Sequence, residues 1–241
     1  MTGNPILEHI RRKTIITGHY GSGKTEFAVS LAMLLAKDYS NAALTQNDKL
    51  AIIDLDIINP YFRSREQRDL LKNNGIEIFG SAFETESTAE VPALSAKLRA
   101  PLEDSSCRVV IDTGGNDAGA LVLNQFSKYF TDDETTVLAI VNANRPDTCS
   151  IDGALEHIKA IEYITNLNVT YIVNNTHMLR ETTVADIQAG QNLCEEICEK
   201  TGKSLLCSCY PKGIINPDEL TGISDNLMPL GLYMRPTWLD K

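Results

Sequence analysis

Short apolar segments alternate with longer stretches of helical periodicity along the whole chain. The apolar segments are continuous rather than alternating, and polar residues follow each of them. Continuous runs of this length are typical of parallel strands that are buried on both faces. We expect strands at 14–17, 50–55, 109–111, 137–141, 169–173 and 205–207.

Helical patterns fill the intervals between these strands, at 26–37, 61–73, 90–100, 117–130, 150–165 and 183–200. Regular alternation of strand and helix predicts a mostly parallel sheet with right-handed crossovers. The expected fold class is therefore α/β, a three-layer α/β/α domain. The stretch 38–49 is expected to be a polar surface loop, and nothing marks a domain boundary, so 1–241 is expected to be one domain. Ligand-binding groups should lie at the carboxyl ends of the strands.

A glycine-rich loop follows the first strand and precedes the first long helix. It matches the P-loop pattern of Gly, four residues, then Gly-Lys-Ser/Thr, in the strand–loop–helix context that phosphate binding requires. Glycines let backbone N–H groups converge on a phosphate, and the helix N-terminus adds partial positive charge. The loop predicts nucleoside triphosphate binding by Gly18, His19, Tyr20, Gly21, Ser22, Gly23, Lys24 and Thr25.

Within this loop, Lys24 is expected on the β- and γ-phosphates and the Thr25 hydroxyl on Mg²⁺. Glu26 follows directly and is expected near the cofactor, either facing solvent or paired with Arg63. His19 is a candidate contact to a phosphate or a partner. The other histidines show no ligand spacing.

Two carboxylates, Asp54 and Asp56, end the second strand. Residues at i and i+2 of a strand point to one face, so both should lie beside the P-loop. Asp56 is expected to orient the attacking water, and Asp54 to lie nearer the magnesium ion. Arg63 and Arg65 follow on a candidate switch segment, where they would meet a phosphate or an acidic partner, or simply face solvent.

The strand at 109–111 is followed by Asp112, Thr113, Gly114 and Gly115. An Asp after a buried apolar strand is the Walker B arrangement, which holds Mg²⁺ directly or through water. Gly114 allows the backbone to approach the γ-phosphate, so loss of that phosphate could move the segment that follows. This is how a nucleotide switch works.

The base is expected to be adenine. Guanine recognition uses an Asn-Lys-x-Asp motif after a late strand, and the corresponding run here is Asn174, Asn175, Thr176, His177, without a carboxylate. An amide can both donate to and accept from the adenine edge. Asn174 or Asn175, with backbone near Pro211, are the expected base contacts. The segment 142–147 closes a neighbouring strand and is a further candidate contact.

The order of these motifs resembles the SIMIBI class of P-loop proteins, and more narrowly the MinD/ParA and CobQ/CobB nucleotide-binding family. The stretch 210–217 is similar to the proline-containing segment that closes on adenine in that family. The resemblance implies an ATP-dependent switch that acts on a protein partner, with a nucleotide-dependent homodimer as one form. The signature lysine of that family is replaced by His19, and the tail, interrupted by Pro236, does not resemble a basic membrane helix.

Two other functions are open. A small-molecule kinase or ATP-dependent ligase of the dethiobiotin-synthetase or CobB type would use Arg63, Arg65 or Arg145 to bind a substrate carboxylate. A metal or iron–sulfur assembly ATPase would use the cysteine pairs at 194 and 198 and at 207 and 209, although buried free thiols are the favoured explanation of both pairs.

Charge and hydropathy limit the expected binding partners and the expected location of the protein. The net charge of −10 disfavours nonspecific binding to nucleic acid or anionic lipid. The sequence has no long apolar run and no signal-peptide core, so a cytoplasmic protein is expected.

Overall fold

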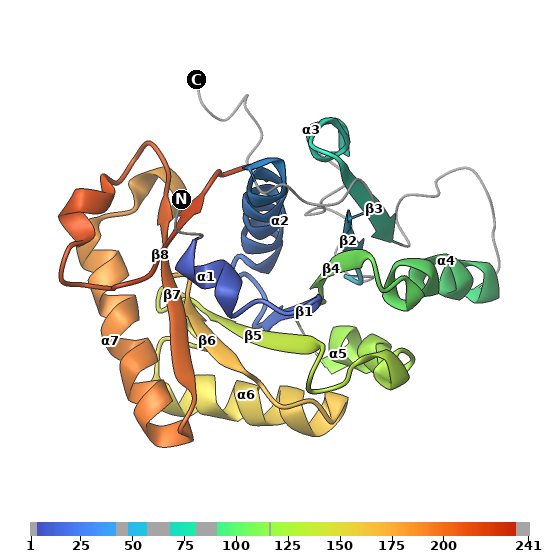
Figure 1. Cartoon of the computed structure of the whole chain (residues 1–241). Helices are drawn as coiled ribbons and strands as arrows, with labels where there is room; N and C mark the ends of the chain where they lie inside the picture. The colour runs from blue at the N-terminus through green and yellow to red at the C-terminus, as the bar shows by residue number, and fades with distance from the viewer. Residues whose placement is uncertain (1–3, 42–47, 57–67, 81–90, 116, 235–241) are drawn as a thin grey trace.

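One sheet of eight parallel strands forms the centre of the molecule, in the order β3-β2-β4-β1-β5-β6-β7-β8 (Figure 1). The computed structural model describes residues 4–41, 48–56, 68–80, 91–115 and 117–234. The strands are β1 (Lys13–Gly18), β2 (Lys49–Asp54), β3 (Ile76–Gly80), β4 (Cys107–Asp112), β5 (Thr135–Val141), β6 (Tyr171–Asn174), β7 (Ser204–Pro211) and β8 (Leu227–Leu230).

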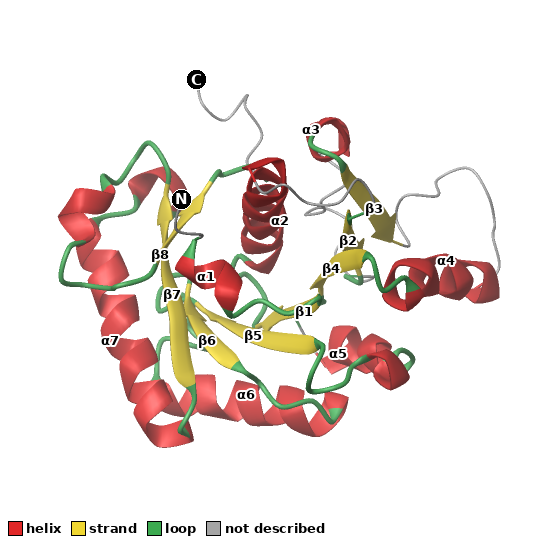
Figure 2. Cartoon of the chain, in the orientation of Figure 1, coloured by secondary structure: helices red, strands yellow, loops and turns green. Residues whose placement is uncertain are grey.

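Helices cover both faces of this sheet (Figure 2). One face carries α1 (Pro5–Glu8), α2 (Lys24–Asn41) and α3 (Arg68–Asn73), whose buried side chains share a single apolar cluster with the strands. A second cluster lies on the other face, under α4 (Val91–Glu103), α5 (Asp117–Asn124), α6 (Ile151–Thr165) and α7 (Val184–Thr201). The expected three-layer α/β/α fold is therefore confirmed.

The apolar pattern of the sequence explains both layers of the core. Consecutive strand residues point to opposite faces, so Ile15 belongs to the cluster that α4 to α7 cover, while Ile16 belongs to the cluster that α1 to α3 cover. On α2, Phe27, Leu31 and Leu35 are spaced by four residues and are fully buried. Burial of each such side chain stabilises the fold by roughly 1.5–3 kcal/mol.

Capping residues set the ends of the last two long helices. Ser150 caps α6 by accepting a hydrogen bond from the Gly153 amide, and Asn166 ends that helix in the left-handed conformation. Thr183 begins α7 with a capping box to Asp186. The predicted ranges 150–165 and 183–200 therefore agree closely with the structure.

Several predicted boundaries were wrong. The edge strands β3 and β8 were not predicted, and residues 38–41 belong to α2 rather than to a loop. The strand predicted at 169–173 begins two residues later, at Tyr171, and the helix predicted at 117–130 ends at Asn124. The predicted helix at 61–73 is described from Arg68 onward, and Arg63 and Arg65 lie outside the described residues.

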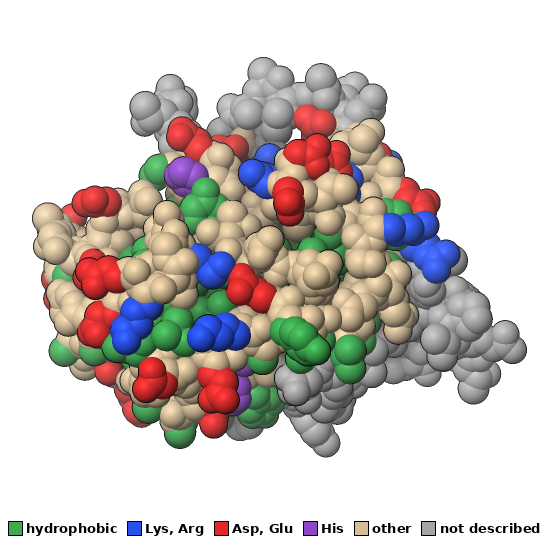
Figure 3. Space-filling model, turned by 90° about the horizontal axis from the view of Figure 1, so that it is seen from below, with side chains coloured by type: hydrophobic (Ala, Val, Ile, Leu, Met, Phe, Trp, Pro, Cys, Tyr) green, Lys and Arg blue, Asp and Glu red, His purple; other side chains and the backbone are tan. Residues whose placement is uncertain are grey.

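Charged side chains of both signs are interspersed on the face shown in Figure 3. Among the described helices, none combines the length and the apolar composition needed to cross a lipid bilayer.

Candidate functional site

The P-loop lies where the crossover connections from two neighbouring strands run toward opposite edges of the sheet. The chain leaves β1 through α2 toward β2, whereas it leaves β5, the neighbour of β1 on the other side, through α6 toward β6. Loops at the carboxyl ends of two such strands form the ligand crevice of open α/β sheets. The loops after β1 and β5 therefore lie where a ligand is expected.

Lys24 is buried within its own loop. Its ammonium donates a hydrogen bond to the His19 carbonyl at 3.0 Å, and its side chain is 7% exposed. Burial lowers the pKa of Lys24, while the charges of Asp112 and Asp56 act in the opposite direction. The two carboxylates thus favour the charged form of Lys24, although burial has the larger effect on its pKa.

Thr25 and Asp112, two of the three residues predicted at the magnesium site, are in direct contact. The Thr25 hydroxyl donates to Asp112 Oδ2 at 2.6 Å. Asp112 Oδ1 is buried and has no hydrogen-bond partner among the residues that the structure describes. An oxygen of this kind beside a threonine hydroxyl fits the all-oxygen ligand preference of Mg²⁺, so the residues fit the metal that the P-loop implies.

A second carboxylate, that of Asp54, lies beside Asp112 on the neighbouring strand. Asp54 and Asp112 are register partners in β2 and β4, and both are buried. Burial, and then the charge of Asp54, raises the pKa of Asp112 to about 7, although the Thr25 hydrogen bond and Lys24 oppose the shift. Two buried carboxylates side by side repel each other unless a cation lies between or beside them.

Asp56 lies at the rim of this acidic group. It is half-buried, and its backbone N–H donates to Asp54 Oδ1 at 3.0 Å. The candidate switch segment at 57–67 lies outside the described residues.

The backbone after β4 passes directly over the P-loop. Thr113 donates from its backbone N–H and its hydroxyl to the Ile16 carbonyl, which ties the two strand ends together. A Cβ atom on Gly115 would lie 2.7 Å from the Tyr20 nitrogen and 2.8 Å from Lys24 Nζ. Only glycine permits this approach, and it brings the segment after Gly114 next to Lys24, as the switch prediction requires.

The predicted base contacts have different surroundings from each other. The Asn174 amide donates to the Ile187 carbonyl and to Ser208 Oγ, and its oxygen accepts from the Thr176 N–H. These internal bonds occupy the Asn174 side chain, so the prediction of a base contact from Asn174 is not supported. Pro211 lies buried at the end of β7.

Asn175, in contrast, reaches the P-loop. Its Nδ2 donates to the Ser22 carbonyl at 2.7 Å, while its buried Oδ1 has no partner among the described residues. His177 lies beside it, with Nε2 3.2 Å from the position of a Cβ on Gly23. Burial, and then the charge of Arg145, lowers the pKa of His177 to about 4, so this imidazole is neutral. The sequence analysis missed His177 because histidine spacing gave no signal.

Glu26 is not placed as predicted. Its carboxylate is 5% exposed and accepts hydrogen bonds from the backbone N–H groups of Tyr233 and Met234, at 2.9 and 2.8 Å. Ser30 links the same segment, since its hydroxyl donates to Glu26 and accepts from the Gly231 N–H. The Glu26 side chain therefore faces neither solvent nor nucleotide. It anchors residues 231–234 to the first turn of α2.

Three of the four paired cysteines lie in the core, and the fourth, Cys198, is half-buried. Cys194, Cys207 and Cys209 are fully buried, and burial raises the pKa of the Cys209 and Cys194 thiols. A raised thiol pKa opposes metal ligation, which requires the thiolate. No cluster of three or more metal-ligating His, Cys, Asp or Glu residues occurs within the described ranges.

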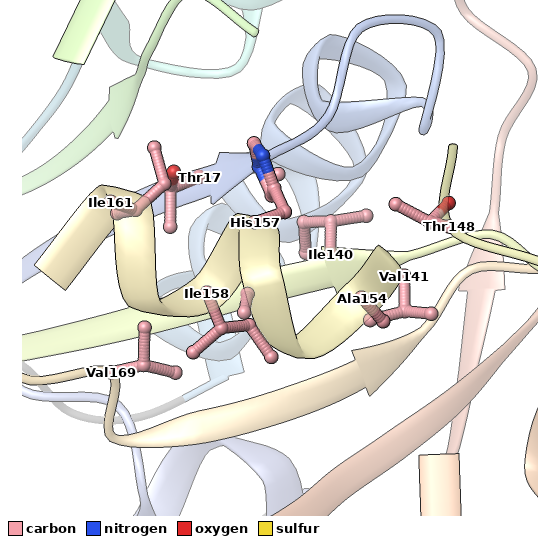
Figure 4. A pocket seen from close by; sticks show the side chains of 11 residues that line it. Thr17, Ile140, Val141, Thr148, Ala154, His157, Ile158, Ile161 and Val169 are labelled. Carbon is pink, nitrogen blue, oxygen red and sulfur yellow. The ribbon is translucent and has the colours of Figure 1, made fainter. Parts of the chain in front are cut away.

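Two cavities lie away from the phosphate-binding face of the loop. The one in Figure 4 lies between α6 and the strands β1 and β5, next to Thr17 and His157, and its volume of about 10 Å³ holds at most a water molecule. A larger cavity of about 260 Å³ lies at the amino ends of the strands, next to Arg11, Thr135 and Thr170.

No family model matches the chain, and no curated protein matches it either. Among solved structures, the chain is similar to the signal recognition particle receptor FtsY from Elizabethkingia anophelis, with 17% identity and a TM-score of 0.50 over 90% of this chain and 68% of that one. It is also similar to FtsY from Thermotoga maritima, with 16% identity and a TM-score of 0.52 over 90% of this chain and 74% of that one.

A third structure, the Elizabethkingia anophelis receptor in complex with GDP, has 16% identity and a TM-score of 0.50, covering 93% of this chain and 63% of that one. Identities this low show a shared fold and not a shared ligand. The fold is therefore shared with these FtsY structures, while the resemblance to the SIMIBI class, and more narrowly to MinD/ParA and CobQ/CobB, stays a prediction.

Proposed function

We propose that this chain binds Mg²⁺-ATP at the P-loop and hydrolyses it, as a nucleotide-controlled switch that acts on a protein partner. The observation that carries the proposal is the contact between the Thr25 hydroxyl and Asp112 at 2.6 Å, with Lys24 buried in the same loop. These groups lie together at the carboxyl ends of β1 and β4. A phosphate and a divalent cation are the ligands that such a set of groups fits.

The proposed roles follow from the charge and position of each side chain. Lys24 stabilises the negative charge that develops on the transferred phosphoryl group. Thr25 and Asp112 would hold Mg²⁺, which supplies further positive charge there, and Asp54 would support it from the next strand. Asp56 is the half-buried carboxylate at the rim, where it would orient the attacking water.

Asn175 supports adenine as the base. One N–H of its Nδ2 is used by the Ser22 carbonyl, which leaves the second N–H and the acceptor Oδ1 for a ligand. A donor beside an acceptor can pair with the adenine edge, where the exocyclic amino group donates and a ring nitrogen accepts. The GDP in the Elizabethkingia anophelis receptor belongs to a protein of 16% identity, and it carries no base preference to this chain.

The switch part of the proposal rests on the described ends of two strand connections, Asp56 after β2 and Gly115 after β4. Asp56 lies beside Asp54, and Gly115 lies beside Lys24. Contacts of these residues to the γ-phosphate would form with ATP and be lost on hydrolysis. The partner that reads this change would be another protein or, in the homodimer form, a second copy of this chain.

Phosphate release tests the enzymatic part. The wild-type protein is expected to release phosphate from ATP in the presence of Mg²⁺, and Lys24→Ala is expected to reduce the rate by about 10²–10³-fold. Arg99→Ala, an exposed change on α4, is the matched control. An equal rate in Lys24→Ala would contradict the proposal, and a new phosphorylated or amidated metabolite would favour a kinase or ligase.

The oligomeric state tests the homodimer form. Asp56→Ala should retain ATP unhydrolysed, so light scattering of this variant compares the ATP-bound and ADP-bound states directly. A dimer with ATP alone supports the homodimer. The same mass with ATP and with ADP contradicts it and leaves a different protein as the partner.

A further inference from the structure

The segment between β5 and α6, residues 142–150, runs along the outside of the P-loop and contacts it twice. Arg145 Nε donates a hydrogen bond to the Gly21 carbonyl at 2.6 Å. Asp147 Oδ2 lies 3.7 Å from His19 Nδ1. The contacts are made at the second and fourth positions of the loop, and they come from the one other strand that borders the predicted ligand crevice.

Arg145 extends from a turn whose shape is fixed by its own hydrogen bonds. The Arg145 N–H donates to the Asn142 carbonyl, and Thr148 Oγ1 donates to the same carbonyl from the other end of the turn. Thr176 Oγ1 accepts from the Ala143 N–H, which joins the turn to the loop after β6. The turn is thus a rigid base for a long side chain.

The contact restrains one particular peptide of the P-loop. The Gly21 carbonyl and the Ser22 N–H belong to the same planar unit, and the Ser22 N–H donates to the His19 carbonyl at 3.1 Å. Gly21 has a φ of +75° and no side chain, so rotation of this unit meets little steric resistance. The hydrogen bond from Arg145 opposes that rotation and keeps the carbonyl directed outward.

The guanidinium also brings charge to this side of the loop. The positive charge of Arg145 acts on the buried His177, whose ring lies beside Gly23. Nε is occupied by the Gly21 carbonyl, and the remaining N–H donors of the guanidinium extend beyond it. The second position of the loop, which is His19 here, supplies no permanent charge of its own.

We propose that Arg145 is a positioning residue of the nucleotide site, which fixes the Gly21–Ser22 peptide for phosphate binding and adds a permanent positive charge to the loop. The inference rests on the proposed nucleotide binding. It adds to the nucleotide site a residue that follows β5 and lies outside the P-loop motif. Preorganisation of the loop lowers the cost of ordering it when the nucleotide binds.

Isothermal titration with Mg²⁺-ATP, and with ATP alone, tests the proposal on the full chain. Loss of the preorganised Gly21–Ser22 peptide and of a positive charge beside the loop predicts that Arg145→Ala weakens nucleotide binding by about 10- to 100-fold. Arg145→Lys, which keeps the charge and a donor, should recover most of the affinity. Arg99→Ala should bind as the wild type does.

Two further readouts separate positioning from general support of the fold. Because Arg145 is exposed, the melting temperature of the nucleotide-free protein should be nearly unchanged in Arg145→Ala. An NMR titration of the nucleotide-free variant should show a higher pKa for His177 than in the wild type, since a nearby positive charge has been removed.

Three results would overturn the inference while leaving nucleotide binding intact. They are equal affinity in Arg145→Ala and Arg99→Ala, no recovery in Arg145→Lys, and a large drop in the melting temperature of nucleotide-free Arg145→Ala. Failure of the wild-type protein to bind any nucleotide would instead overturn the proposed function itself, and the inference with it.

Discussion

Glu26 offers a stability test that is independent of the nucleotide. Replacement by Ala removes the acceptor for two backbone N–H groups, those of Tyr233 and Met234. Leaving a buried donor unsatisfied costs about 1–3 kcal/mol per group, and the buried carboxylate itself carries a desolvation penalty that is relieved in the variant. The expected net loss is therefore about 3 kcal/mol. For a chain of this size it corresponds to a melting temperature lower by roughly 6–12 °C.

Thermal unfolding by circular dichroism measures this loss, with Glu196→Ala, an exposed change within α7, as the control. Hydrogen exchange then locates it, because the amides of Tyr233 and Met234 should lose protection in Glu26→Ala while those of β1 keep theirs. Unchanged protection at these two amides, or a melting temperature equal to that of Glu196→Ala, would refute the anchoring role of Glu26.

Three further predictions concern the site and its surroundings. The raised pKa of Asp112, about 7, means that the folded protein holds this proton more tightly than the unfolded chain. The nucleotide-free protein should therefore lose stability as the pH rises from about 4 through about 7. Urea unfolding should show that Asp112→Asn removes this dependence, and an equal dependence of the unfolding free energy on pH in the two proteins would contradict it. Gly190→Ala would place a Cβ 2.1 Å from Thr176 Oγ1 and should cost about 1–3 kcal/mol in the same assay, and a neutral result would contradict the close packing of α7 on this loop. Gly115→Ala, with its Cβ against Lys24 Nζ, should lower phosphate release by roughly 100-fold, and a wild-type rate would contradict the approach of this segment to Lys24.

The interior of the fold could be predicted because its signals are local. Strands buried on both faces appear as continuous apolar runs, so β1, β2, β4 and β5 were found close to their true positions. The edge strands lack that signal. Only the first and last residues of β3 are buried, and β8 is four residues long and contains Pro229, which an edge strand tolerates.

The motif residues of the candidate site could also be predicted from the sequence. The P-loop and the acidic residues after β2 and β4 follow from motif spacing, and the structure brings Thr25, Asp54 and Asp112 together. Contacts between distant segments could not be predicted in this way. The Glu26 carboxylate finds its partners more than 200 residues away, and the contact of Arg145 with Gly21 spans 124 residues.

The difference between Asn174 and Asn175 illustrates the same limit. Asn174 ends β6, Asn175 follows it, and both carry an amide, so the sequence offers no reason to prefer one. The structure distinguishes them because consecutive residues of an extended chain point to opposite faces. Asn174 is bonded to Ser208 and α7, while Asn175 reaches the Ser22 carbonyl.

The most direct test of the central claim is a titration of the wild-type protein with ATP and with GTP, each with Mg²⁺ and with a chelator, beside Lys24→Ala. The account predicts that ATP binds more tightly than GTP, that Mg²⁺ strengthens binding, and that Lys24→Ala loses most of the affinity. Absence of nucleotide binding, tighter binding of GTP, or equal affinity in Lys24→Ala would contradict it.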